Sequence, residues 1–232
     1  MKAAVLAGLL ALTASTAAAY EPCRQALALG LDVSGSVDAR EYRLQISGVA
    51  QALNSTAVRA ALMEHLQTPV ELLIYEWSGP QDMQTLVPWT RISGPAPLQA
   101  VIDQLHATER RDEATPGTAL GVAMMRGAQH LAQRQACWRK TLDISGDGKN
   151  NLGPRPRDIK HQLVQAEITI NGLVVGAEAD AAATQELGRY FHTEVILGPE
   201  AFVEIATGFE DYATTMEDKL LRELRSLILS HR

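Results

Sequence analysis

The sequence predicts an α/β fold with a mostly parallel central sheet, one antiparallel edge strand and helices on both faces. The main observation is that short apolar runs alternate with segments whose apolar residues recur at helical spacing. One pair of strand-like segments is separated only by a short turn, which predicts a single antiparallel pair. The composition, with 46% hydrophobic and 21% charged residues, is typical of a globular protein with a sizeable core.

The first half of the chain predicts a strand, a helix and then the antiparallel pair. The apolar run 26–33 (ALALGLDV) ends in turn residues, and helical spacing follows over 38–53. Residues 70–77 (VELLIYEW) and 83–92 (MQTLVPWTRI) predict two antiparallel strands joined by the turn SGPQD. Pro88 lies inside the second strand and has no N–H for a ladder hydrogen bond, so we expect that strand at a sheet edge.

The second half of the chain continues the alternation. Helical spacing predicts helices over 97–107, 118–135, 157–166, 181–190 and 212–229. Apolar runs predict strands at 141–145 and 168–175, and 195–197 can add a short edge strand. Ligands of such sheets bind beyond the carboxyl ends of the strands, so the loops after Val33 and Ser145 are the expected place for a site.

The N-terminal residues predict export from the cytoplasm. Residues 1–19 combine Lys2, an apolar run over 3–12 and the small residues 17–19, which is typical of a secretory signal peptide cleaved after Ala19. Residues 20–232 are then expected to form one domain, periplasmic or secreted. Because the apolar run is shorter than the roughly 20 residues that span a bilayer, we expect no membrane insertion.

Two further features of composition bear on covalent links and partners. The chain has two cysteines, Cys23 and Cys137, and an oxidising compartment favours a disulfide between them, with two buried free thiols as the alternative. The formal net charge is −6 and no basic cluster stands out, which does not favour a nucleic-acid partner.

Three segments carry oxygen-bearing side chains at predicted strand ends. Asp32, Ser34 and Ser36 occupy alternate positions just after the first apolar run. Thr118 lies on a loop directly before a helix, and Asp147 lies in a glycine-flanked loop after a strand. Hard cations prefer oxygen ligands that include one or two carboxylates, so these segments predict a site for one Mg²⁺ ion, or Mn²⁺ or Ca²⁺ in its place.

Two members of this set have alternatives nearby. Thr115 shares the loop with Thr118, but Thr118 lies next to the start of the helix and is preferred for that reason. Asp143 precedes Asp147 by four residues, but its position inside a strand directs it into packing or away from a loop site. Thr118 and Asp147 are therefore the preferred ligands.

Taken in order, the DxSxS string at 32–36, the GT before a helix and the DG after a later strand resemble the metal-ion-dependent adhesion site of von Willebrand factor A domains. The resemblance implies a Rossmann-like von Willebrand factor A fold for residues 20–232. It also implies that the serine and threonine hydroxyls touch the ion, whereas Asp32 and Asp147 act through waters. Over nearly the whole mature chain, the sequence is similar to uncharacterised bacterial exported proteins of this class, in LDVSGSVDAREY, EWSGP, CWRKTLDISGDGKNN and NGLVVG.

The resemblance also bears on the cysteines and on function. In this fold the strands that follow Cys23 and Cys137 are parallel neighbours, so the cysteines are expected to meet at the sheet edge opposite the cation. The implied function is a monomeric, non-enzymatic binding module, in which the cation captures an Asp or Glu of an unknown protein partner. Candidate contacts near the cation are Glu76, Trp77, Ser78, Lys149 and Asn150. For Trp77, a place in the core is the alternative.

Two other functions are compatible with the same residues. A metal-dependent hydrolase, for example of phosphoesters, would need a positioned general base, and only Lys149 is near in sequence. A structural envelope protein would show no metal dependence. The six histidines lack the spacing of a zinc site and no serine lies in a GxSxG elbow, so a zinc enzyme or an ordinary serine hydrolase is not favoured.

Overall fold

A six-stranded sheet forms the centre of the molecule. The computed structural model describes residues 21–111, 115–177 and 179–225, so the expected signal peptide lies outside the described residues. The strands are β1 (Cys23–Asp32), β2 (Val70–Trp77), β3 (Met83–Arg91), β4 (Cys137–Gly146), β5 (Thr169–Val175) and β6 (Val203–Ala206). Their order is β3-β2-β1-β4-β5-β6, and every neighbouring pair is parallel except β2 with β3. The predicted fold class and the edge position of the strand that contains Pro88 are confirmed.

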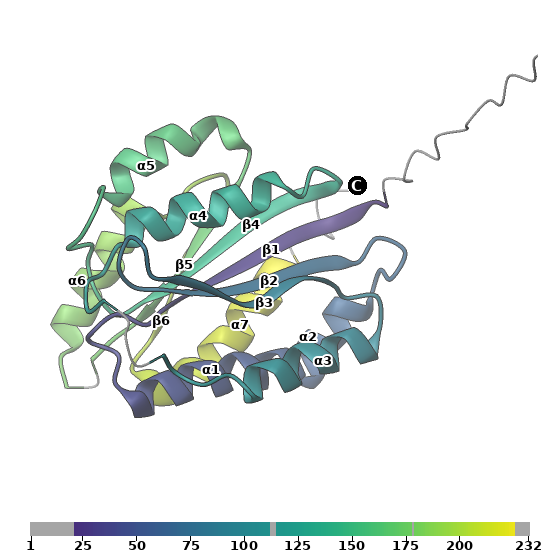
Figure 1. Cartoon of the computed structure of the whole chain (residues 1–232), viewed down its shortest axis with the longest axis horizontal. Coiled ribbons are helices and arrows are strands. Elements are labelled where there is room, and N and C mark those ends of the chain that lie inside the picture. The colour runs from purple at the N-terminus through teal and green to yellow at the C-terminus, as the bar shows by residue number, and fades with distance from the viewer. Residues whose placement is uncertain (1–20, 112–114, 178, 226–232) are drawn as a thin grey trace, which may run out of the picture.

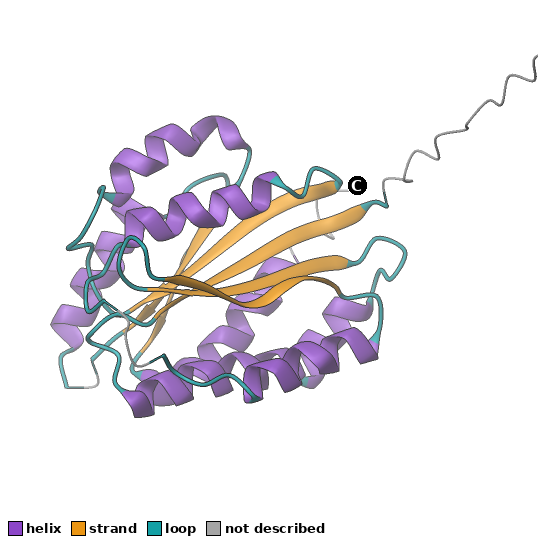
Figure 2. Ribbon diagram, in the orientation of Figure 1, coloured by secondary structure: helices purple, strands orange, loops and turns teal. Residues whose placement is uncertain are grey.

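Helices cover both faces of this sheet (Figures 1 and 2). They are α1 (Ala39–Asn54), α2 (Thr56–Met63), α3 (Pro95–His106), α4 (Leu120–Ala132), α5 (Pro156–Leu163), α6 (Ala181–Tyr190) and α7 (Tyr212–Arg225). One face packs against α1, α2, α3 and α7, and the other against α4, α5 and α6. The last residues of the predicted helix 212–229 lie outside the described residues.

The alternation of side chains along β1 builds both cores. Leu27, Leu29 and Leu31 point into the layer of α1 and α7, whereas Ala26 and Ala28 point into the layer of α4. All ten residues of β1 are buried, as expected of a central parallel strand covered on both faces. The carboxyl end of β1 is therefore held rigidly under the loop that begins at Asp32.

Helix α1 begins at a capping box directly after that loop. The Asp38 carboxylate accepts hydrogen bonds from the main-chain N–H groups of Arg40 and Glu41, and the Glu41 side chain accepts from the Asp38 N–H. This reciprocal pairing satisfies donors at the helix start that would otherwise lack partners. The turn that contains Ser34 and Ser36 is thus fixed at both of its ends, by β1 and by α1.

The outer strand beside β5 lies later in the chain than the sequence predicts. Residues 195–197 are not a strand, because Phe191–Val195 continues α6 as a π-helical turn and Leu197 makes only an isolated antiparallel bridge with Ile170. A strand parallel to β5 must first return to the amino end of β5. The chain has reached that end at Leu197, which bridges Ile170, and a turn at Gly198, where φ is 97°, then reverses its direction before β6.

The two cysteines meet at the amino ends of β1 and β4. Cys23 and Cys137 are the first residues of these strands, are register partners, and form a disulfide with a Cα–Cα distance of 4.4 Å. Their separation of 114 residues closes a long loop, for which the chain-entropy account gives about 4 to 5 kcal/mol of stabilisation. None of the described helices has the length and apolar character required to cross a membrane.

Candidate metal centre

Asp32 is the last residue of β1 and lies at the carboxyl edge of the sheet. Its side chain is buried, with a relative exposure of 1%, and its Oδ1 accepts a hydrogen bond from the Ser34 N–H at 2.9 Å. The second oxygen, Oδ2, is also buried and has no hydrogen-bond partner within the described part of the chain. A buried carboxylate oxygen without a partner is costly, so this atom requires a physical explanation.

The loop after β1 is joined to the loop after β4 by hydroxyl groups. The Ser36 Oγ donates to Asp147 Oδ1 at 2.8 Å, and the Oγ atoms of Ser34 and Ser36 are 3.3 Å apart. Ser34 is fully buried, whereas Ser36 is exposed. The hydroxyls therefore connect the two carboxylates from the buried Asp32 to the outer Asp147.

The loop between α3 and α4 brings Thr118 to the same place. The Thr118 Oγ1 lies 3.7 Å from the point that a Cβ would occupy on Gly148, the residue after Asp147. The Gly35 N–H donates to the Pro116 carbonyl at 3.0 Å, which joins this loop to the loop after β1. A side chain at position 35 would meet Pro116 at 2.7 Å, so only glycine fits this contact.

The alternative residue Thr115 contacts the turn between β2 and β3. It is exposed, and its N–H donates to the Asp82 Oδ2 at 3.1 Å in the turn between β2 and β3. Asp143, the alternative to Asp147, is buried in the sheet, where its Oδ1 lies 2.7 Å from the Lys219 Nζ. Both placements favour Thr118 and Asp147 for a cation site.

Asp32 and Asp147 place two carboxylates of like charge close together at this edge. Burial raises the pKa of Asp32 to about 8, and the negative charge of Asp147 adds to this rise, while hydrogen bonding from Ser34 and from the main chain of Asp147 opposes it. Burial likewise raises the pKa of Asp147, against the hydrogen bond from Ser36. None of the ion pairs among residues 21–111, 115–177 and 179–225 includes either aspartate. Two carboxylates and three hydroxyls form the oxygen set that a hard divalent cation prefers.

A second cluster of ligand-type side chains is not suited to a metal. Cys23, Glu71 and Cys137 place a carboxylate oxygen and two sulfur atoms within 4.8 Å of one another. Both sulfurs are joined in the disulfide, however, so neither is a thiolate that could coordinate an ion. Glu71 is instead paired with Arg91 and Arg134.

Three of the residues predicted to contact a partner are buried in the structure. Glu76, Trp77 and Ser78 have relative exposures of 1%, 0% and 0%, so they do not form a contact surface. The sequence placed them at the correct end of β2 but could not show that the loop between α3 and α4 passes over that end. The core alternative is confirmed for Trp77, which packs in the layer of α4.

The other two predicted contacts lie in the loop after β4. Lys149 is exposed and forms an ion pair with Glu186, an arrangement that does not favour it as a general base. Asn150 has a mainly structural place, since its Oδ1 accepts from the Gly121 N–H at 3.1 Å at the start of α4. Lys149 thus remains a predicted rim contact, whereas the Asn150 amide is already used within the protein.

Sequence reasoning missed the residue that holds Thr118 in place. The Asn151 Oδ1 accepts from the Thr118 N–H at 2.8 Å, and the Asn151 N–H donates back to the Thr118 carbonyl at 3.0 Å. The consecutive asparagines after the DG at 147–148 were the available signal, because asparagine side chains commonly satisfy main-chain groups in loops.

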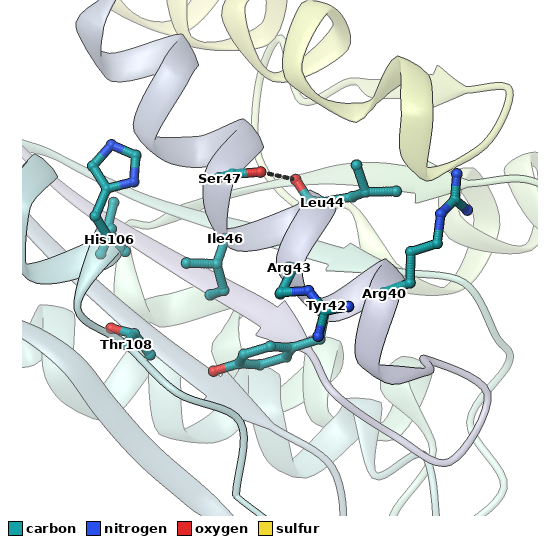
Figure 3. Close-up of a pocket in the computed structure, with 9 residues that line it drawn as sticks. Arg40, Tyr42, Arg43, Leu44, Ile46, Ser47, His106 and Thr108 are labelled. Carbon is teal, nitrogen blue, oxygen red and sulfur yellow. Dashed lines mark hydrogen bonds between the residues drawn. The ribbon is translucent and has the colours of Figure 1, made fainter.

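Two surface pockets flank the start of α1 and share Arg40. One, of about 400 Å³, adjoins the site and is lined by residues that include Asp147, Gly176 and Phe209. The other, of about 340 Å³, lies between α1 and the segment after α3, with Tyr42 and Thr108 in its lining (Figure 3). The first pocket leaves space beside Asp147 for a ligand to approach.

The sequence matches the family described as "Protein of unknown function (DUF1194)" over residues 22–228. No curated protein matches it.

Several solved structures share the fold. Proximal thread matrix protein 1 from the mussel byssus, in a structure with a zinc-occupied MIDAS motif, has a TM-score of 0.59 and 14% identity, covering 88% of this chain and 48% of that one. The von Willebrand factor type A structure from Catenulispora acidiphila has a TM-score of 0.57 and 12% identity, covering 89% and 43%. The pilus adhesin SpaC from Lactobacillus rhamnosus GG has a TM-score of 0.60 and 16% identity, covering 89% and 30%. The chain therefore spans half or less of each of these proteins, and the likeness concerns the fold.

Proposed function

The chain belongs to the DUF1194 family, and we propose that it is an exported binding module that uses one divalent cation to capture an acidic side chain of a partner protein. The proposed cation ligands are Asp32, Ser34, Ser36, Thr118 and Asp147, with Mg²⁺ as the expected ion and Mn²⁺ or Ca²⁺ as substitutes. The proposed domain is residues 20–232, released from a signal peptide that ends at Ala19.

The observation that carries the proposal is the unpartnered Oδ2 of Asp32. This buried oxygen lies beside Gly146, 3.2 Å from the point a Cβ would occupy there, at the edge where Asp147 contributes a second carboxylate. A bound cation would offset the free-energy cost of burying both carboxylates. Without a cation, uncharged side chains at these two positions would avoid that cost.

The residues of the site have distinct parts in this proposal. Asp32 supplies the buried charge, and the hydroxyls of Ser34, Ser36 and Thr118 supply neutral oxygen ligands. Asp147 supplies the outer charge and borders the pocket of about 400 Å³. When bound, the cation would offer a position to a carboxylate oxygen, and such a charge-assisted contact is strong for its size.

The comparisons support the proposal at the level of the fold. One structural neighbour holds zinc in its own MIDAS motif, and another is a pilus adhesin. The disulfide agrees with a periplasmic or secreted location, because such bonds persist in oxidising compartments. We further propose a monomer whose partner is a protein, with Lys149 as a rim contact and with neither nucleic acid nor membrane insertion involved.

Two measurements on the purified mature chain test the proposal. Isothermal titration with Mg²⁺ and with Mn²⁺ should give one saturable site, and the same titration of Asp32→Asn should give none. Water-proton relaxation of the Mn²⁺-loaded protein should then fall when acetate is added, because a carboxylate displaces water from the ion, whereas acetamide should have little effect.

Contrary results are equally specific. Equal binding of Mn²⁺ by the wild type and by Asp32→Asn would show that the ion binds somewhere other than this edge of the sheet. Binding without any response to acetate would leave a cation site that does not capture carboxylates. A crosslinking pull-down from the cell envelope, run with Mg²⁺ and with EDTA, can then identify the partner.

A further inference from the structure

The loop between α3 and α4, which carries Thr118, is fastened at several points to residues 76–82 at the end of β2. We propose that Glu76 is a positioning residue for the cation site: it holds Arg111 and Tyr42 against the end of β2, where the segment that carries Thr118 is also fastened, and it thereby sets the position of Thr118. The inference rests on the proposed function above, since it concerns how well the site is formed.

Glu76 uses both of its oxygens to join three parts of the fold. Its Oε1 accepts from the Arg111 Nε at 2.9 Å, and its Oε2 accepts from the Tyr42 hydroxyl at 2.9 Å. Arg111 belongs to the loop that leads to Thr118, and Tyr42 belongs to α1, whose start follows the DxSxS segment. One buried carboxylate thus connects the end of β2, the helix after the first ligand segment and the loop of the Thr118 segment.

Tyr42 extends this connection along the segment after α3. Figure 3 shows its ring directed from α1 toward Thr108, on the far side of the pocket. The hydroxyl also lies 3.5 Å from the Glu109 carbonyl oxygen. Because Tyr42 is buried, with a relative exposure of 2%, its position is set by packing as well as by Glu76.

The turn after Glu76 provides two further fastening points on the same loop. The Asp82 Oδ2 accepts from the Thr115 N–H at 3.1 Å, and the Ser78 carbonyl accepts from the Ala119 N–H at 2.8 Å. The second contact lies one residue beyond Thr118. Asn151 hydrogen-bonds to Thr118 itself, so the Thr118 segment is fastened both to residues 76–82 and to the loop after β4.

Energetics favour a positioning role over a purely stabilising one. Replacing a buried ion pair with apolar residues of similar volume is often neutral for stability, because the cost of removing the charges from water offsets their attraction. A carboxylate at position 76 adds directional contacts that an apolar residue cannot make. Within the described residues, the hydrogen bonds of the Glu76 carboxylate go to Arg111, which precedes the Thr118 segment, and to Tyr42 of α1, the helix that follows the DxSxS segment.

The test compares two glutamates of the same strand. Glu76→Gln keeps an acceptor for Tyr42 but loses the charge that pairs with Arg111. Glu71→Gln is the matched control, because Glu71 also lies in β2 and also pairs with two arginines, Arg91 and Arg134, but at the other end of the strand. Titration with Mn²⁺ should show affinity lowered by about tenfold or more for Glu76→Gln, the effect typical of groups that orient metal ligands. Glu71→Gln should stay within about twofold of the wild type.

A second measurement, on the metal-free protein, does not depend on a bound ion. Amide hydrogen exchange at Thr118 and Ala119 should be faster in Glu76→Gln than in the wild type, and unchanged in Glu71→Gln. Adding Arg111→Gln to Glu76→Gln should cause no further loss of Mn²⁺ affinity, because the two residues act through one contact. Additive losses would contradict that mechanism.

The outcomes separate this inference from the proposed function. If the wild type binds no Mn²⁺, the proposed function fails, while the exchange measurement still decides whether Glu76 anchors the loop. If the wild type binds Mn²⁺ and Glu76→Gln matches Glu71→Gln in affinity, the positioning role is overturned and the proposed function stands. Should Glu76→Gln fail to fold, Asp82→Ala is the second variant, because it removes the surface contact with Thr115. An unchanged Mn²⁺ affinity in Asp82→Ala would contradict the inference that contacts with residues 76–82 set the position of Thr118.

Discussion

Strand β4 and the residue just beyond it carry two aspartates whose pKa burial raises, but only one of them has a cation close by among the described residues. Asp143, in the middle of the sheet, has an internal cation, because the Lys219 Nζ lies 2.7 Å from its Oδ1. Asp147, the residue directly after the last residue of β4, lies near Asp32, and neither takes part in an ion pair of the described chain. The described residues therefore supply a counter-charge in the core but none at the edge.

The core cluster is closed by hydrogen bonds as well as by charge. Lys219 also pairs with the Glu223 Oε1 at 2.8 Å, and the Asn171 Nδ2 donates to the same oxygen at 2.7 Å. All four side chains are at most 2% exposed. This cluster joins α7 to β4 and β5, so its role is structural, whereas none of the ion pairs of the described residues includes Asp32 or Asp147.

The largest expected effect comes from removing the core cation. Lys219→Met should lower the free energy of unfolding by about 3 to 5 kcal/mol, because Asp143 and Glu223 would remain buried without a counter-charge. Urea denaturation measures the change. The triple variant Lys219→Met/Asp143→Asn/Glu223→Gln should recover much of it, and a failure to recover would show that the cluster acts through packing instead of charge.

The next largest effect is expected at the edge of the sheet, where replacing an aspartate should not destabilise the metal-free protein. Asp32→Asn should weaken Mg²⁺ binding by more than about 100-fold, beyond the effect of an orienting group. It should also leave the metal-free protein as stable as the wild type or stabilise it by about 1 kcal/mol or more at pH 8, since burial disfavours the carboxylate. Asp143→Asn is the control and should destabilise the protein. Equal destabilisation by both variants would contradict the contrast between the two regions.

A pH titration should sharpen the same contrast. The pKa of Asp32 is raised to about 8 from an ordinary value near 4, so the folded metal-free protein retains a proton that the unfolded chain loses. Its stability should therefore fall as the pH rises between about 4 and 8. Because the cation competes with that proton, apparent Mg²⁺ affinity should rise by up to about tenfold per pH unit and level off above about pH 8. Calorimetry from pH 6 to 9 checks this, and an affinity independent of pH would exclude Asp32 as a ligand.

The smallest expected effect lies at the rim of the site. Lys149→Ala removes an exposed ion pair with Glu186, so stability should change by less than about 1 kcal/mol and Mg²⁺ affinity by less than about twofold. Thermal melts and calorimetry measure the two quantities. A larger loss of Mg²⁺ affinity would indicate that Lys149 helps to position the loop that carries Asp147.

Local patterns were sufficient for most of the elements. The predicted strand 70–77 coincides with β2, the predicted helix 181–190 coincides with α6, and the helix over 38–53 differs from α1 by one residue at each end. The outer strand at 195–197 was wrong, because pairing in parallel with β5 depends on where the chain turns back. That turn at Gly198 is a property of the assembled sheet.

The candidate site likewise combines features that follow from the local sequence with features that depend on the tertiary structure. The sequence by itself determined which oxygen side chains follow which strands, since strand ends and turn residues are local features, and it predicted that Cys23 and Cys137 would meet. Only the tertiary structure decided that Glu76, Trp77 and Ser78 are covered and that Asn151 holds Thr118. It also decided that Asp143 pairs with Lys219, whereas Asp32 has no cationic partner among the described residues. Burial and the distance to a counter-charge depend on elements far apart in the chain, and no local pattern of residues records them.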